Sequence, residues 1–142
     1  MRKTILSVLF LFILFGATLR AQTEIKLSPL LIAGLVAVSI EQGFRGETGV
    51  ELDILGAEGF FYSYVSGKYY FNPRMGLDRF YAGVFLGGGS DVGAGGGFLI
   101  GSKLLSRSNK VLFEIGVGAG RSFTDGNFIP TGKLHFGYRI GG

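Results

Sequence analysis

Near the carboxyl end of the chain, residues 133–140 read KLHFGYRI. Four apolar residues in this stretch alternate with two basic residues, a histidine and a glycine. A period of two is the spacing of side chains on a β-strand, and a helix does not produce it. The stretch therefore predicts a strand with one apolar face and one face that is charged or small.

Similar alternation, interrupted by glycine, proline and polar clusters, runs back through the chain from this point. It predicts eight strands, at residues 25–32, 35–44, 48–56, 60–71, 79–89, 94–104, 111–121 and 129–140. The connections are short enough for hairpins and leave no room for a crossover helix. We therefore expect an all-β fold, an eight-stranded antiparallel up-and-down barrel.

The composition fits one folded domain without covalent cross-links. The chain has 142 residues, of which 47% are apolar and 17% charged, which differs from the composition of disordered proteins. It contains 26 glycines and no cysteine, so disulfides and thiolate metal sites are excluded. Stability must come from packing, backbone hydrogen bonds or closure of the sheet.

The first 21 residues have the layout of a secretory signal peptide. Arg2 and Lys3 form a positive start, residues 5–15 are almost entirely apolar, and the segment ends in the small residue Ala21. The apolar run is too short to span a bilayer as a helix. We predict cleavage after Ala21, which leaves residues 22–142 as the barrel domain.

Removal of this segment changes the net charge. The whole chain carries +4, but Arg2, Lys3 and Arg20 lie in the predicted signal peptide, and the remainder has 11 Lys and Arg against 10 Asp and Glu. A near-neutral domain lacks the basic surface that nucleic-acid binding requires, so we expect no nucleic-acid partner.

The glycines indicate which face of the barrel lies inside. Several glycines occupy the strand face opposite the large apolar residues: Gly83, Gly87, Gly101, Gly116, Gly118, Gly120 and Gly137. An eight-stranded barrel has little interior room, so small residues belong inside. The bulky residues would then face outward, toward lipid: Phe80, Phe113, Phe136, Tyr138 and Ile140. With strands of about ten residues and an export signal, this favours a transmembrane barrel.

Charged residues share the inward parity with the glycines. They are Lys26, Lys68, Lys103, Lys133 and Arg139, against Glu41, Glu51, Asp53 and Glu114. Ions enclosed in a narrow lumen must nearly cancel and be hydrogen-bonded. We therefore expect the four acids to pair with Lys68, Lys103, Lys133 and Arg139 across the lumen, in a structural network that closes it to ions. His135 is expected in the lumen or at its rim, paired with Glu114 on the adjacent strand.

Several segments resemble one family of proteins. They are Lys26–Leu30, Ser39–Glu41, the aromatic Lys68–Phe71, Phe80–Gly83 and the glycine-rich run into Gly101. Together they are similar to uncharacterised small outer-membrane β-barrel proteins of Gram-negative bacteria, which share the shape of outer membrane proteins A and X. The resemblance implies an outer-membrane location, with contact with membrane lipid and lipopolysaccharide, and it supplies no established catalytic residues to carry over to this chain.

Two local features carry further expectations. Pro29 lacks a backbone donor, so we expect a bulge there or a first strand that starts later. Phe136, Tyr138 and Ile140 resemble the carboxy-terminal signal that the barrel-assembly machinery reads, so we expect that machinery as a partner during insertion. We expect the inserted barrel to be a monomer.

The sequence leaves three functions open. The first is a structural, envelope-integrity barrel without enzymatic activity; the second is a soluble periplasmic barrel that, like lipocalins, binds a small hydrophobic ligand. The third is an outer-membrane lipid-modifying enzyme that would use Ser102 or Ser122 with His135 and Glu114. We expect no metal, because His135 is the only histidine. We also expect no cofactor, because Gly87–Gly97 lacks the lysine and hydroxyl residues of a phosphate loop.

Overall fold

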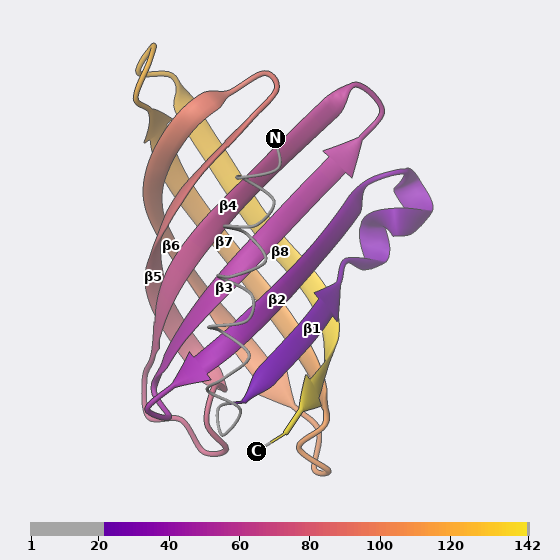
Figure 1. Ribbon diagram of the computed structural model, residues 1–142. Helices are drawn as coiled ribbons and strands as arrows, with labels where there is room; N and C mark the ends of the chain where they lie inside the picture. Colours follow the sequence, from indigo (N-terminus) through magenta and orange to yellow (C-terminus); the bar gives the residue numbers. More distant parts are fainter. Residues whose placement is uncertain (1–21, 142) are drawn as a thin grey trace, which may run out of the picture.

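The protein folds into a closed antiparallel barrel of eight strands. The structure is a computed structural model that describes residues 22–141, so the predicted signal peptide and its cleavage site lie outside the described residues. Each strand pairs with the next along the chain, and β1 pairs with β8 (Figure 1). The predicted all-β, eight-stranded barrel is confirmed. Within residues 22–141, no helix has the length and apolar character needed to cross a bilayer.

The strand positions follow the alternation of side chains closely. The elements are β1 (Thr23–Leu27), the 3-10 helix η1 (Pro29–Ala33), β2 (Val36–Phe44), β3 (Thr48–Ala57), β4 (Phe60–Tyr70), β5 (Arg79–Gly89), β6 (Gly93–Leu105), β7 (Val111–Ser122) and β8 (Phe128–Ile140). For β2 to β8, the predicted and observed ends differ by at most one residue.

The first strand was predicted wrongly, because Pro29 ends it. β1 begins at Thr23 and stops at Leu27, and the chain then turns into η1 instead of forming a bulge or a later strand. Leu27 is opposite Phe136, so the next rung of the β1–β8 ladder would need a donor from residue 29. Proline has no N–H, and the ladder stops there.

β8 continues past the end of β1. Its residues 128–135 have no partner in β1, and Pro130 lies in this stretch. The Arg139 N–H donates to the Lys110 carbonyl on the β7 side. The backbone groups of odd-numbered residues of β8 therefore point toward β7, and those of even-numbered residues, Pro130 among them, point away from it. Proline is tolerated at such an unpaired edge because no ladder bond is lost.

The register fixes the shape of the barrel. A row of paired residues that leaves β8 at Arg139 passes through Glu24, Glu41, Glu51 and each later strand, and returns to β8 at Ile129. The return is ten residues away from the start, so the shear number of the barrel is ten. In an eight-stranded barrel such a stagger tilts the strands by about 40°.

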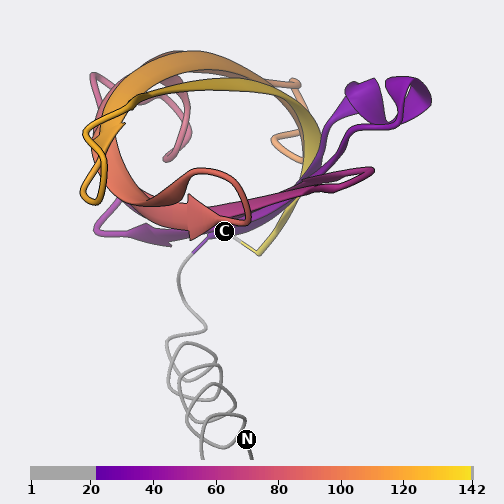
Figure 2. The ribbon, with the colours of Figure 1, turned by 90° about the horizontal axis from the view of Figure 1, so that it is seen from above.

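The connections lie at two rims. We call the end that carries both termini the terminal rim, formed by residues 45–47, 71–78 and 106–110; the distal rim is formed by 28–35, 58–59, 90–92 and 123–127. Viewed down the barrel, the strands form a ring and η1 projects outward from it (Figure 2). The two longest connections have eight residues each, 28–35 at the distal rim and 71–78 at the terminal rim, and the first of them replaces the two-residue turn predicted at 33–34.

The two faces of the sheet differ sharply in polarity. Along the strands, the charged side chains of the inner face are buried, whereas many large apolar side chains point outward and are at least 40% exposed. In the strands, these exposed residues include Ile25, Leu27, Val65, Phe80, Val84, Leu86, Phe98, Ile100, Leu104, Ile115, Val117, Phe136, Tyr138 and Ile140. In a water-soluble barrel the apolar face would instead fill the interior.

Inward glycines make room for aromatic rings. The seven glycines predicted on the inner face lie there, alternating with outward residues. A Cβ atom at Gly116 would come within 2.6 Å of the Tyr81 hydroxyl oxygen, and one at Gly120 within 2.8 Å of Phe85. Both rings reach over strands beyond their own, so these glycines are required by packing.

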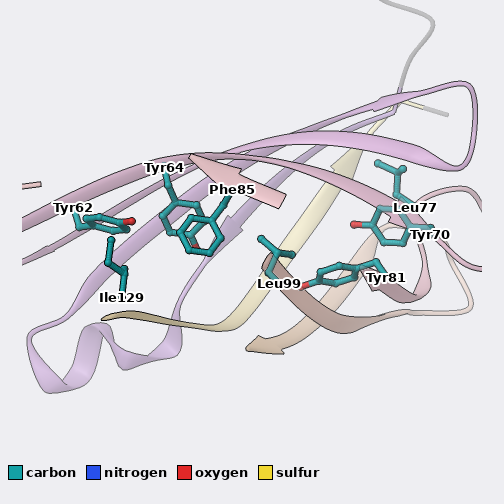
Figure 3. Packing of buried hydrophobic residues seen from close by; sticks show 8 residues of the cluster. All are labelled: Tyr62, Tyr64, Tyr70, Leu77, Tyr81, Phe85, Leu99 and Ile129. Carbon is teal, nitrogen blue, oxygen red and sulfur yellow. The ribbon is translucent and has the colours of Figure 1, made fainter. Parts of the chain in front are cut away.

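The buried aromatic residues form two groups. Tyr62, Tyr64, Phe85 and Ile129 cluster toward the distal rim, and Tyr70, Tyr81 and Leu77 cluster toward the terminal rim, with Leu99 between them (Figure 3). The rings of Tyr64 and Phe85 pack in a tilted arrangement with centroids 5.5 Å apart, and those of Tyr70 and Tyr81 do so at 5.3 Å. Tyr62 and Tyr64 of β4 therefore face the lumen.

We predict that Gly116→Val lowers the free energy of unfolding by about 1–3 kcal/mol, because its side chain overlaps Tyr81. Gly132→Val is the matched control, since Gly132 faces outward with nothing within 4 Å of its Cβ position. Urea unfolding in detergent micelles, followed by circular dichroism, gives both values. Equal stability of the two variants would show that Tyr81 does not pack over Gly116.

Candidate functional site: a charged network in the barrel lumen

Ten ionisable side chains lie together inside the barrel. Each is at most 4% exposed: Glu24, Lys26, Glu41, Glu51, Asp53, Lys68, Lys103, Glu114, Lys133 and Arg139. Five are basic and five acidic, so the formal charge of the lumen is zero. A buried ion costs several kcal/mol in lost hydration, which only nearby opposite charges and hydrogen bonds can offset. The equal number of acidic and basic groups is therefore necessary for this interior to be stable.

The centre of the network is a group of three carboxylates around two ammonium groups. Lys26 Nζ donates to Glu41, to Glu114 and to Glu51, the last at 2.5 Å. Lys68 Nζ contacts the same three carboxylates, at 3.2 Å from Glu41 and 2.6 Å from Glu114. These five residues come from five different strands, so the network ties the wall together across the lumen.

Toward the terminal rim, Glu24 joins two further cations. Arg139 donates to Glu24 Oε1 through Nε at 2.9 Å and Nη2 at 2.7 Å. Lys103 Nζ lies 2.5 Å from Glu24 and 2.7 Å from Glu41, which links this group to the centre. Because Glu24 and Arg139 are paired across the β1–β8 ladder, this contact also closes the barrel.

The long connection 71–78 folds back into this end of the lumen. Arg139 donates to the Met75 carbonyl at 2.6 Å and to the Leu77 carbonyl at 3.2 Å, and Leu77 is fully buried. The Leu77 N–H in turn donates to Gln22 Oε1 at 3.2 Å. The connection therefore acts as an internal plug at the terminal rim, a feature that the sequence did not reveal.

Toward the distal rim, the network ends at Lys133. Its ammonium group lies 2.7 Å from Asp53 Oδ2 and also pairs with Glu51. The same nitrogen lies 5.3 Å from the centre of the Tyr64 ring. Beyond Lys133 the interior becomes aromatic, so the charged part of the lumen gives way to a packed apolar part.

Tyrosines complete the coordination of the charged groups. The Tyr81 hydroxyl donates to Glu114 at 2.6 Å, and the Tyr70 hydroxyl donates to Glu41. The Lys68 ammonium lies 4.6 Å from the centre of the Tyr81 ring, and Lys103 lies 4.7 Å from that of Tyr70. Each tyrosine thus supplies a donor to an acid and a π face to a cation, which together solvate the pair in place of water.

His135 does not pair with Glu114, so that expectation is wrong. The two residues are opposite each other on β7 and β8, and His135 is buried, but neither ring nitrogen has a hydrogen-bond partner within residues 22–141. The Glu114 oxygens instead accept from Lys26, Lys68 and Tyr81. The stronger charge-assisted contacts draw this carboxylate to the centre of the lumen, away from the imidazole.

The sequence missed Glu24. The predicted first strand began at residue 25, which left Glu24 outside the count of inward charges and gave five cations against four acids. The signal was present, because Glu24 and Lys26 have the same parity and alternate with the exposed Ile25 and Leu27. The structure brings the other predicted network residues together, with His135 as the one lacking a polar contact among the described residues.

Three network carboxylates have the spacing of a cation site. One oxygen each of Glu41, Glu51 and Glu114 lies within 4.8 Å of the others. The Lys26 ammonium donates to all three, and it therefore provides the positive charge that these oxygens need. In this arrangement the acids bind a cation that belongs to the chain itself.

The residues considered for lipid chemistry are not assembled. Ser102 alternates with the inward Gly101 and Lys103, so it lies on the outward face, whereas His135 and Glu114 face inward. Ser122 faces inward but lies at the distal end of β7, eight residues from Glu114, and its hydroxyl accepts from the Thr124 N–H. Neither serine lies near the imidazole in the way a nucleophile and base require.

Comparison with protein-family models, curated protein sequences and solved structures gives no match for this chain. A barrel by itself does not define a function, since one fold serves many. The inference about function therefore rests on the chemistry of the two faces of the wall and on the network inside.

We predict that Glu114→Gln lowers the free energy of unfolding by about 3–5 kcal/mol, because it leaves Lys26 and Lys68 with excess buried charge. The control is Glu58→Gln in the exposed β3–β4 turn, for which we expect a change within about 0.5 kcal/mol. Adding Lys68→Met to Glu114→Gln should recover part of the loss. Equal effects of the two single substitutions in urea unfolding would contradict the network.

Proposed function

We propose that this protein is an integral outer-membrane barrel that serves the integrity of the envelope as a structural element. The observation that carries the proposal is the inverted polarity of the wall: ten charged residues are buried inside, and large apolar side chains cover the outside. Water does not favour such an exterior, since exposed apolar surface of this extent is rare on soluble monomers. A bilayer does favour it.

The position of exposed aromatic residues supports a membrane-spanning band. Tyr69, Phe71 and Phe80 form a contiguous group near the terminal rim, with ring centroids 5.1 and 5.6 Å apart. Phe128 and Tyr138 are exposed at the two ends of β8, ten residues apart. At the rise and tilt of these strands, ten residues correspond to about 25 Å along the barrel axis, the height of the apolar band of outer-membrane barrels.

The filled lumen favours a structural role over transport. The charged network occupies the half near the terminal rim, the plug 71–78 lies below it, and aromatic side chains fill the half near the distal rim. An eight-stranded barrel is just wide enough for its side chains. The soluble, lipocalin-like alternative would need an apolar interior for its ligand, and here the interior holds charges.

The location rests on further predictions. The predicted signal peptide directs export, and the resemblance to small outer-membrane barrel proteins points to a Gram-negative outer membrane. Insertion by the barrel-assembly machinery, contact with lipopolysaccharide and a monomeric state belong to the same proposal. The strand count supports them, because eight is the smallest number among bacterial outer-membrane barrels.

We predict that Phe98→Arg lowers the free energy of unfolding by about 2–4 kcal/mol in phospholipid vesicles, because it puts a charge halfway along β6, near the bilayer centre. Phe98 is 74% exposed, so the substitution removes little internal packing. The control is Thr124→Arg, which adds the same charge to the exposed distal connection 123–127.

The contrast between these two variants separates the membrane and soluble readings. On a water-facing wall, Phe98→Arg would be neutral or stabilising, as surface substitutions usually are. Unchanged or increased stability of Phe98→Arg, together with solubility in buffer without detergent, would contradict the proposal.

A further inference from the structure

Charges outside the lumen divide unequally between the two rims. The terminal rim, together with Arg79 at the adjoining start of β5, carries five cations, Arg45, Arg74, Arg79, Arg107 and Lys110, and two acids, Glu47 and Asp78. The distal rim, together with Arg121 near the adjoining end of β7, carries one cation and three acids, Glu58, Asp91 and Asp125. With the neutral lumen, these residues account for the net charge of +1 of residues 22–142. The small net charge therefore hides a difference between the two ends of the barrel, of which the terminal end is positive and the distal end negative.

The five cations of the terminal rim are free to meet a partner. All five side chains are exposed, and within residues 22–141 none has an acid within salt-bridge distance. The two acids of this rim are engaged: Asp78 accepts from two backbone N–H groups of the plug, and Glu47 accepts from the Tyr69 hydroxyl. Each of the three connections at this rim contributes at least one cation.

Backbone strain gives an independent sign that the arginines have a use. Arg45 has a φ of 50° and Arg79 a φ of 73°, in the left-handed region that costs energy for a bulky residue. Asparagine or glycine would occupy these positions with less strain. Arg79 has a structural use, since its guanidinium donates to the Asn72 carbonyl at 3.0 Å, but Arg45 has no such contact within residues 22–141.

The type and position of these cations indicate that their partner is a phosphate group. Four of the five cations are arginine, whose planar guanidinium binds phosphate oxygens in a bidentate manner. The exposed group Tyr69, Phe71 and Phe80 lies at the same end of the barrel, and Met75 of the terminal rim is also exposed. Aromatic residues of this kind mark the boundary between acyl chains and headgroups. The cations thus lie at the level where lipid phosphates would be.

We propose that the terminal rim binds the phosphate headgroups of anionic phospholipids in the leaflet next to the chain termini. This inference rests on the proposed membrane location. The acidic distal rim would disfavour the same headgroups, so the two rims together set the orientation of the barrel. Each cation near an anionic lipid surface contributes about fivefold in affinity.

The test compares two lipids with identical acyl chains. The protein, purified in detergent from membranes of cells that express the full chain, is titrated with dioleoyl phosphatidylglycerol or dioleoyl phosphatidylcholine and examined by native mass spectrometry. We expect phosphatidylglycerol to bind at least about tenfold more tightly at low salt, and less so at 0.3 M salt.

Two matched substitutions locate the effect. Arg45→Asn removes one charge at the terminal rim and relieves the strained backbone, so we expect about fivefold weaker phosphatidylglycerol binding with no loss of folding. Arg121→Gln removes one charge at the distal rim and should leave binding unchanged. Combining Arg45→Asn with Arg74→Gln, Arg107→Gln and Lys110→Gln should abolish the preference, while Arg79 is kept because it holds Asn72.

Three results would overturn the inference: equal affinity for the two lipids, equal loss in Arg45→Asn and Arg121→Gln, or tighter binding of soluble polyphosphate than of phosphatidylglycerol. The last would identify the partner as a soluble polyanion. A heat-dependent gel shift of the same preparations reports on the proposed membrane barrel itself. Absence of the gel shift would count against the proposed membrane barrel. The ratio of the affinities for phosphatidylglycerol and phosphatidylcholine tests the lipid inference alone.

Discussion

Neutralisation of charge inside a narrow barrel is the constraint on which this structure depends. Ten ions are removed from water, and five cations and five acids cancel with tyrosine hydroxyls and rings completing their coordination. Lys26 and Lys68 each contact three carboxylates from different strands, and Lys103 joins Glu24 to Glu41, so the pairs are not independent. Such a network is favourable only when every member is satisfied. Loss of one partner therefore affects the whole wall.

The network also explains features of the backbone. β1 pairs with β8 over only five residues, and Glu24 and Arg139, opposite each other in that ladder, are joined by two hydrogen bonds. Arg139 then holds the plug through the Met75 and Leu77 carbonyls. One guanidinium thus supports both closure of the sheet and closure of the lumen. The glycines opposite Tyr81 and Phe85 leave the space in which aromatic rings complete the filling.

Much of this could be predicted from sequence, because a wall with one apolar and one charged or glycine face produces a clear period of two. β1 was misplaced because the apolar residues after Pro29 hide the point where the ladder loses its donor. Glu24 was then overlooked, although it shares the parity of Lys26. The particular partners were not predictable, because a stagger of ten residues brings together side chains that are far apart in sequence. His135 shows the same limit: register placed it beside Glu114, but competition for that carboxylate decided the contact.

The most direct test of the central claim, that charges lie inside and apolar residues face a membrane, is heat-modifiability after detergent extraction. The full chain is expressed, envelopes are separated from soluble protein, and boiled and unboiled samples of each fraction are compared on a gel. The account predicts that the protein enters the membrane fraction, requires detergent for extraction, and migrates differently after boiling. A protein that stays in the aqueous fraction without detergent and shows no shift would contradict it.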